Sequence, residues 1–217
     1  RAPSGLAHAR ETTRQILTDP ALLALYAFAA LAMGSFVATY NALGFRLAAP
    51  PYSLSLGVAG LVFLSYALGS VSSTLAGGLA DRFGRRPVLF AGLLAHWGQK
   101  GPAEIEPKRA WVVVALGGLA VTLAAPLWLV IVGVAVTTTG FFAAHGVASG
   151  WVSARAHTGG GGTGQAVSLY LFAYYLGSSV FGTVSGLAWT SGGWDRVVLV
   201  VGGLMALALL CALALRR

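Results

Sequence analysis

Charged side chains gather in one short segment of this sequence, between two long apolar runs. Residues 77–87 read GGLADRFGRRP, in which the carboxylate of Asp81 is followed by the guanidinium groups of Arg82, Arg85 and Arg86. A carboxylate at the end of a helix opposes the helix dipole, so Asp81 needs nearby arginines or the amino end of another helix, and the arginines could also bind anionic lipid headgroups. The segment is too polar to cross a bilayer, so we expect a water-facing turn between two membrane helices.

One histidine lies well inside an apolar run. Apart from tyrosines and Cys211, His145 is the only titratable side chain in such a position. The ordinary pKa of an imidazole lies near neutral pH, which suits a role in proton coupling. A hydrogen-bonded packing residue is the more common role of a lone histidine there, and both interpretations stay open. No predicted span contains a carboxylate, so a proton-coupling acid would have to lie outside this chain.

Two stripes of aromatic and polar side chains occur at helical spacing, which places each stripe on one face of a helix. The first consists of Met33, Phe36, Tyr40 and Asn41, and the second of Tyr170, Tyr174 and Ser178, with Tyr175 beside it. Aromatic rings with a polar tip suit flat or amphipathic organic molecules, but packing between helices is an equally good interpretation of each residue. Asn41 is the strongest candidate, because an amide inside a membrane needs a hydrogen-bond partner.

Several classes of site are absent from the sequence. No nucleophile is paired with a base, no set of metal ligands occurs, and no phosphate-binding loop precedes a helix. We therefore predict that the chain is not an enzyme and needs no cofactor or metal. The lone Cys211 excludes an internal disulfide. The basic residues lie at the ends of apolar runs, which argues against a nucleic-acid partner despite the net charge of +8.

Composition sets the class of protein that must position these residues. Hydrophobic residues make up 57% of the 217-residue chain and charged residues 9%, and the mean hydropathy is +0.77. These values lie outside the usual range of soluble domains. The apolar residues also form blocks of about 20 residues, the length of a helix that crosses a bilayer. The sequence therefore predicts an all-α membrane protein with several spans.

Breaks in the apolar blocks define six transmembrane helices. Asp19 followed by Pro20 is typical of a helix start, after a polar leader over 1–19. Pro126 divides one long block, and a run of glycines marks a flexible loop over 151–164. The predicted spans cover about 20–47, 54–80, 110–125, 127–150, 165–189 and 197–215, with a turn over 190–195 before the last one.

A polar insertion over 97–109 interrupts this pattern. Each charge at mid-membrane costs roughly 2.5 to 3.5 kcal/mol, so the insertion cannot lie in the hydrocarbon. In one solution it stays in the cytoplasm, 87–96 forms a short interfacial helix, and the third span is compressed into 110–125. In the other, the insertion splits a single helix formed by those two segments. Both solutions stay open, and both keep six spans.

Basic residues are distributed unevenly between the two sides of this topology. With the amino terminus in the cytoplasm, the cytoplasmic side holds Arg1, Arg10, Arg14, Arg82, Arg85, Arg86, Arg155, Arg216 and Arg217. Apart from the polar insertion, only Arg46 and Arg196 fall on the other side. The positive-inside rule therefore predicts that both termini are cytoplasmic.

The charged hairpin resembles the signature of the major facilitator superfamily. Its G-x-L-A-D-R-x-G-R-R pattern is matched by Gly77, Leu79, Ala80, Asp81, Arg82, Gly84, Arg85 and Arg86. Members of this superfamily have twelve helices in two six-helix halves, so six spans resemble one half. The leader segment ETTRQILTDP resembles the central linker, and the absence of a starting methionine agrees. With YNALGFRL over 40–47 and the block over 126–151, the chain looks like the carboxy-terminal half of a bacterial arabinose-efflux or drug-resistance permease.

The resemblance implies a secondary active transporter of the bacterial inner membrane that exports a small organic molecule against protons by alternating access. It implies that Asp81 and the hairpin arginines lock one conformational state. It also implies that the first, second, fourth and fifth helices of the half line the solute cavity. The implied partners are a small-molecule substrate, protons, the lipid bilayer and either an amino-terminal half or a second copy. A six-helix membrane interaction or sensor module that moves no solute is the alternative, and the sequence does not identify the solute.

Overall fold

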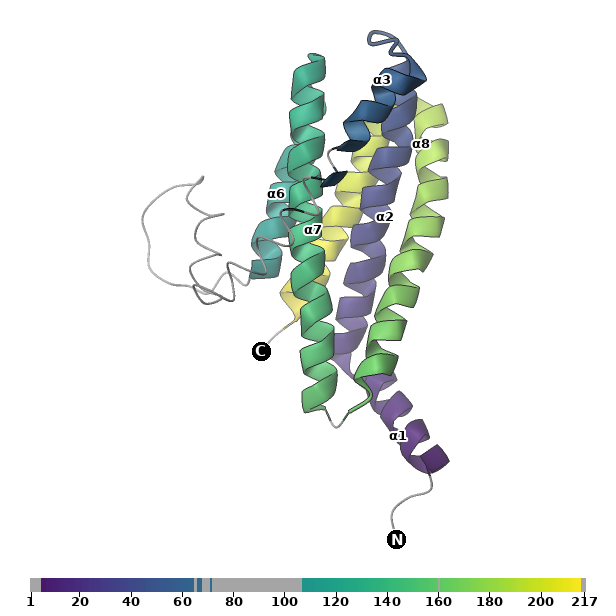
Figure 1. The fold of residues 1–217 in the computed structure, drawn as a ribbon, viewed down its shortest axis with the longest axis vertical. Helices are drawn as coiled ribbons and strands as arrows, with labels where there is room; N and C mark the ends of the chain where they lie inside the picture. Colours follow the sequence, from purple (N-terminus) through teal and green to yellow (C-terminus); the bar gives the residue numbers. More distant parts are fainter. Residues whose placement is uncertain (1–4, 65, 68–70, 72–106, 160, 216–217) are drawn as a thin grey trace, which may run out of the picture.

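The computed structural model describes residues 5–64, 66–67, 71, 107–159 and 161–215. These residues form helices and no strand, which confirms the predicted all-α class. In chain order the elements are α1 (Gly5–Thr18), α2 (Pro20–Ala48), α3 (Leu56–Leu61), the 3-10 helix η1 (Val62–Leu64), α6 (Pro107–Val121), α7 (Leu127–Thr158) and α8 (Thr163–Ala214). Figure 1 shows the long helices side by side in one bundle.

Part of the predicted site lies outside the described residues. This applies to residues 87–106 and to the gate motif, namely Gly77, Leu79, Asp81, Arg82, Gly84, Arg85 and Arg86. Of the polar insertion, residues 107–109 form the start of α6. Within the described ranges, α2, α7 and α8 are long and apolar enough to cross a membrane, and α6 contributes a shorter apolar helix over Val112–Val121. The total of six spans stays a prediction.

Helix α2 begins where a capping side chain and a proline coincide. Asp19 accepts hydrogen bonds at Oδ1 from the backbone N–H groups of Ala21 at 2.8 Å and Leu22 at 3.2 Å. Pro20 takes the first helical position, where no N–H is needed. The sequence predicts this span over about 20–47, and the helix ends one residue later, before two consecutive prolines.

Helix α7 is longer than the span that the sequence predicts over about 127–150. The helix continues through the first half of the segment expected as a loop over 151–164. These extra turns have an apolar face, because Val152 and Ala156 are buried in a cluster with residues of α1, α2 and α8. The chain turns only at the glycines that follow, where Gly162 adopts a φ of 75°.

Helix α8 contains a chain reversal. Its 52 residues would extend about 78 Å at about 1.5 Å per residue, more than twice the roughly 30 Å of a hydrocarbon core. The helical conformation breaks at Gly192 and Gly193. Gly193 has φ 63° and ψ −151°, a backbone conformation that is nearly restricted to glycine. Figure 1 shows the first segment in green beside α2 and the second segment returning in yellow.

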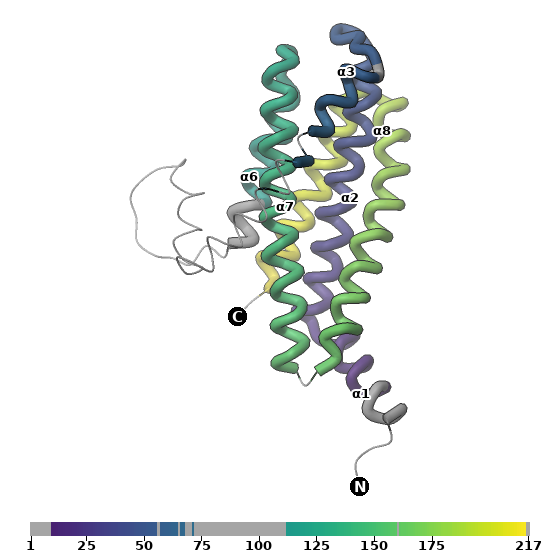
Figure 2. Tube along the Cα trace, viewed as in Figure 1, coloured from purple at the N-terminus to yellow at the C-terminus, as the bar shows by residue number. Residues whose placement is uncertain are grey.

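Glycines bring the helices of two pairs into close contact. In the pair of α2 and α8, a Cβ atom on Gly177 would lie 2.0 Å from the carbonyl oxygen of Ala30. In the pair of α6 and α7, a Cβ atom on Gly118 would lie 2.7 Å from the carbonyl oxygen of Gly133. Figure 2 shows α2 beside the first segment of α8, and α2 also contacts α7. Small residues that let backbones approach in this way are typical of helix contacts in membranes.

Candidate functional site

Aromatic rings from α2, α7 and α8 form a continuous set inside the bundle. Phe36 stacks on Phe141 with ring centroids 4.2 Å apart. Phe141 lies 5.8 Å from His145, whose ring lies 4.9 Å from that of Tyr174. At the other end, Tyr40 lies 4.8 Å from Phe36. This set is called the aromatic column below and consists of Phe36, Tyr40, Phe141, His145, Tyr170 and Tyr174.

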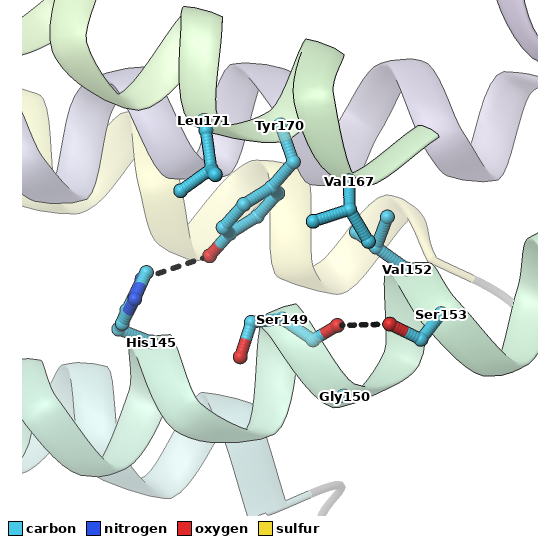
Figure 3. Close-up of a pocket in the computed structure, with 8 residues that line it drawn as sticks. All are labelled: His145, Ser149, Gly150, Val152, Ser153, Val167, Tyr170 and Leu171. Carbon is cyan, nitrogen blue, oxygen red and sulfur yellow. Dashed lines mark hydrogen bonds between the residues drawn. The ribbon is translucent and has the colours of Figure 1, made fainter. Parts of the chain in front are cut away.

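A hydrogen bond joins two of the predicted site residues across the interface of α7 and α8. The Nδ1 atom of His145 lies 2.9 Å from the hydroxyl oxygen of Tyr170 (Figure 3). Tyr170 is buried and His145 is half-buried. In one tautomer the hydroxyl of Tyr170 donates to Nδ1, and Nε2 carries the imidazole proton. In the other, Nδ1–H donates to the hydroxyl oxygen, so Nε2 is an acceptor and the hydroxyl proton can bond with another group. In either state the pair offers one donor and one acceptor.

Two predicted residues of α2 are held by the neighbouring helices. The hydroxyl oxygen of Tyr40 lies 2.7 Å from that of Thr138 in α7, and both side chains are buried. The exposed Asn41 donates from Nδ2 to the carbonyl oxygen of Gly182 in α8 at 3.4 Å. These bonds tie α2 to α7 and α8, and they give the amide the kind of partner expected inside a membrane.

Two further predicted residues flank the column. Met33 is partly buried and packs against the core cluster that contains Phe36 and Tyr40. Ser178 is half-buried on the first segment of α8. Apart from Asn41, the other predicted cavity residues of α2 and α8 belong to the aromatic column itself. The two stripes predicted on separate helices are therefore connected in space, because rings of α7 contact both of them.

A pocket of about 240 Å³ lies between α7 and the first segment of α8 (Figure 3). Its lining residues are His145, Ser149, Gly150, Val152, Ser153, Val167, Tyr170 and Leu171. Ser149 donates from Oγ to the carbonyl oxygen of Gly146 at 3.0 Å, and Ser153 donates to that of Ser149 at 3.5 Å. Within the described ranges, no three His, Cys, Asp or Glu side chains gather as a metal site. The pocket thus combines hydroxyl and imidazole groups with aliphatic walls.

Sequence reasoning missed several residues of this site. Thr138, Phe141 and Ser149 all lie on α7, where only His145 is predicted. Together with that histidine they follow one another at intervals of three or four residues, the spacing of a single helix face. This periodicity is the signal in the sequence that identifies them.

An ion pair lies at the end of the bundle where α1 meets α2. Arg155, in the last turn of α7, donates from Nε to Oδ2 of Asp19 at 2.9 Å. Burial opposes ionisation of Asp19, but the hydrogen bonds from Arg155 and from the backbone N–H groups of Leu22 and Ala21 outweigh it. The pKa of this carboxyl therefore lies below its usual value. Each helix end carries the charge that its dipole favours.

A second polar contact lies at the other end of α2 and centres on Arg46. Its guanidinium donates to the carbonyl oxygens of Thr122 and, at 3.2 Å, of Ala124, both beyond the end of α6. The guanidinium carbon lies 4.7 Å from the ring centroid of Trp194, whose Nε1 donates to the hydroxyl of Thr122 at 3.2 Å. One side chain therefore joins the ends of α2 and α6 to the second segment of α8.

The chain is similar over most of its length to bacterial transport proteins. It is 40% identical over 199 residues to the inner membrane transport protein YnfM of Escherichia coli, which covers 92% of this chain and 42% of YnfM. It is 36% identical over 198 residues to the uncharacterized MFS-type transporter YybF of Bacillus subtilis, which covers 91% of this chain and 42% of YybF. An uncharacterized transporter of Buchnera aphidicola (subsp. Schizaphis graminum) is 32% identical over 201 residues, with 93% and 43% covered.

The chain spans less than half the length of these relatives. All three carry the name of a transporter and not of an enzyme, in agreement with the class that the sequence predicts. No family model matches the chain, and no solved structure matches it.

Proposed function

Because this chain belongs to the major facilitator superfamily, as its similarity to YnfM and YybF over nine tenths of its length shows, we propose that it forms one half of a secondary active transporter. It is an integral membrane protein. In such transporters, two sets of helices move around a solute site that opens to each side of the membrane in turn. The chain covers 42% of YnfM, so the proposal takes the other half from a further segment or from a second copy.

The observation that carries this proposal is the aromatic column. It draws Phe36 and Tyr40 from α2, Phe141 and His145 from α7, and Tyr174 from α8 into one chain of ring contacts. Flat faces with a few polar tips suit a small organic molecule. A site built where three helices meet changes shape when those helices move, as alternating access requires.

We assign proton coupling to His145. Its imidazole lines the pocket, and imidazoles change charge near neutral pH. A proton taken up at Nε2 leaves Nδ1–H donating to the hydroxyl of Tyr170, so the charge beside the solute changes while this hydrogen bond persists. Export in exchange for protons is what the resemblance to efflux-type permeases implies, and the hairpin resemblance implies Asp81 and its neighbouring arginines as the conformational gate.

The proposal places the chain in a bacterial inner membrane with both termini in the cytoplasm. The name of YnfM supports the inner membrane. The uneven distribution of arginines along the sequence supports the orientation.

Reconstitution tests the proposal. Proteoliposomes hold the chain, as a self-associated species or together with a co-expressed other half, and enclose a pH-sensitive dye. A panel of labelled small aromatic and hydroxyl-bearing solutes is then offered with and without a pH gradient. We expect solute accumulation coupled to proton movement, and we expect His145→Gln to remove the proton movement while solute exchange persists.

Two outcomes would count against the proposal. Flux that is independent of the gradient would contradict antiport. Binding of solutes or proteins without any solute movement would favour a membrane interaction or sensor module.

A further inference from the structure

The pocket between α7 and the first segment of α8 has a chemistry that restricts what it can bind. We propose that it selects small, uncharged organic molecules that carry a hydroxyl or amide hydrogen-bond donor, and that it rejects carboxylates, phosphates and ammonium ions. This inference rests on the proposed function, because it names the class of solute that the same site would carry.

The two serines of the pocket have already used their donors. The hydroxyl of Ser149 donates to the carbonyl oxygen of Gly146, and the hydroxyl of Ser153 donates to that of Ser149. A hydroxyl has one donor but two lone pairs, so each serine still offers acceptor capacity. While these two bonds persist, a ligand that bonds with the serine oxygens has to donate a hydrogen bond to them.

The hydrogen-bonded pair of His145 and Tyr170 adds a donor and an acceptor in either tautomer, because one of its two protons forms the bond between the groups and the other stays available. With the two serines, the polar side of the pocket presents three acceptors and one donor. A hydroxyl group, or a primary amide, both donates and accepts. An ether, an ester or a carboxylate only accepts, so it can bond with the single donor of the pocket but with none of its three acceptors.

No charged side chain of the pocket balances a charged ligand. None of the lining residues is acidic, and none is a lysine or an arginine. Arg155, two residues beyond Ser153 along α7, is bound to Asp19. An unpaired charge inside a membrane protein is strongly unfavourable, so a neutral ligand is preferred while the imidazole is neutral.

The remaining wall sets the body of the ligand. Val152, Val167 and Leu171 are the aliphatic side chains that line the pocket, and its volume is about 240 Å³. A small ring or a short branched chain with a polar tip fits such a space. The ring of Tyr170 adds an aromatic surface against which a flat molecule can stack.

Four probes of matched size separate these features in the protein purified in micelles. These are para-hydroxybenzyl alcohol (uncharged donor), para-methylanisole (no donor), para-hydroxybenzoate (anion) and para-hydroxybenzylamine (cation). Binding is followed by nitrogen NMR of the chain labelled at histidine, with the His145 signals identified by His145→Gln. The titration is run at about pH 8, where an ordinary imidazole is neutral. We expect saturable shifts with the alcohol and at least tenfold weaker binding of the other three probes.

Variants locate the binding. Tyr170→Phe removes one hydrogen-bonding group and is expected to weaken binding of the alcohol about 2- to 10-fold. Tyr175→Phe is the matched control, because its exposed ring does not line the pocket, and it is expected to leave binding unchanged. Ser153→Ala supplies a second pocket variant that keeps the helix intact and is expected to weaken binding of the alcohol by a similar factor.

The proposal is overturned when the anion or the cation binds as tightly as the alcohol, when the anisole matches it, or when no probe shifts the His145 signals. It is also overturned when the Tyr170 and Ser153 variants, folded by their helical circular dichroism, bind the alcohol as wild type does. Binding of the alcohol without solute movement in proteoliposomes would instead refute the transport proposal and leave the binding site standing.

Discussion

The hydroxyl of Tyr170 and the Nδ1 atom of His145 meet at 2.9 Å across the interface of α7 and α8, although they lie 25 residues apart in the chain. The contact leaves Nε2 as the ring nitrogen that is available to a proton or a ligand. Phe141, with its ring nearly parallel to the imidazole at an interplanar angle of 11°, supports the same ring from α7. The site therefore depends on how closely two helices are held together, and substitutions that alter their spacing test it.

Loss of the Tyr170 hydroxyl should destabilise the protein as well as weaken binding. Tyr170→Phe leaves the Nδ1 atom of His145 without this partner in a half-buried position, so we expect the free energy of unfolding to fall by about 1–3 kcal/mol. Tyr175→Phe removes an exposed hydroxyl and should change it by less than about 0.5 kcal/mol. Denaturant titration in micelles, followed by circular dichroism, measures both. Equal losses in the two variants would show that the hydroxyl of Tyr170 has no special role.

The close contact of α2 and α8 should not tolerate a side chain at Gly177. A Cβ atom there would lie 2.0 Å from the carbonyl oxygen of Ala30, so Gly177→Ala forces the helices apart, at a cost of about 1–3 kcal/mol. Gly186→Ala is the matched control on the same helix, because the space around that glycine is open. It should be neutral or stabilise by up to about 1 kcal/mol through helix propensity. This packing would be contradicted if Gly186→Ala unfolded at a lower temperature than Gly177→Ala.

Asp19 should make stability depend on pH in mild acid. Its pKa in the folded protein lies below the usual value of 3.8, so its contribution is complete above about pH 5 and is lost as the pH falls through the folded-state pKa. Asp19→Asn keeps a capping oxygen but loses the charge, and we expect it to flatten the pH dependence below about pH 5. Asp19→Ala should lose about 0.5–2 kcal/mol more, because the cap is also removed.

Thermal unfolding of the wild type and both variants between about pH 3 and pH 7 measures these effects. The same acid dependence in wild type and Asp19→Asn would exclude a contribution from the carboxylate charge.

The parts of the fold that the sequence predicts well have local signals. A capping aspartate followed by proline marks the start of α2, and the pair Gly192 and Gly193 lies within the predicted turn between the two segments of α8. The end of α7 also has local signals, namely basic residues in its last turn and the glycines that follow. Residues 151–158 mix apolar and polar side chains, and the burial of Val152 and Ala156 against other helices explains why the helix continues through them.

The candidate site also contains residues that the sequence identifies and residues that it does not. Stripes at helical spacing identify Tyr40 and Tyr170 as residues of one face each, but their partners Thr138 and His145 depend on which helices pair. Spacing within a helix cannot reveal contacts between helices. The hairpin around Asp81 is the strongest motif in the sequence, yet it lies outside the described residues, so its role as a gate stays a prediction.

The planar side chain of Arg46, and not its charge alone, should stabilise the end of α2. Its planar guanidinium donates to two carbonyl oxygens beyond the end of α6 and packs over the ring of Trp194. A lysine keeps the charge but lacks the planar fork, so we expect Arg46→Lys to lower the free energy of unfolding by about 1–3 kcal/mol. It should also alter the fluorescence of Trp194, which Trp194→Phe isolates from that of the other tryptophans.

The exposed Arg196 supplies the matched control, and Arg196→Lys should change stability by less than about 0.5 kcal/mol. If Arg46→Lys unfolds like the wild type while Trp194→Phe is destabilised, packing of the indole alone, and not the arginine, joins these helix ends.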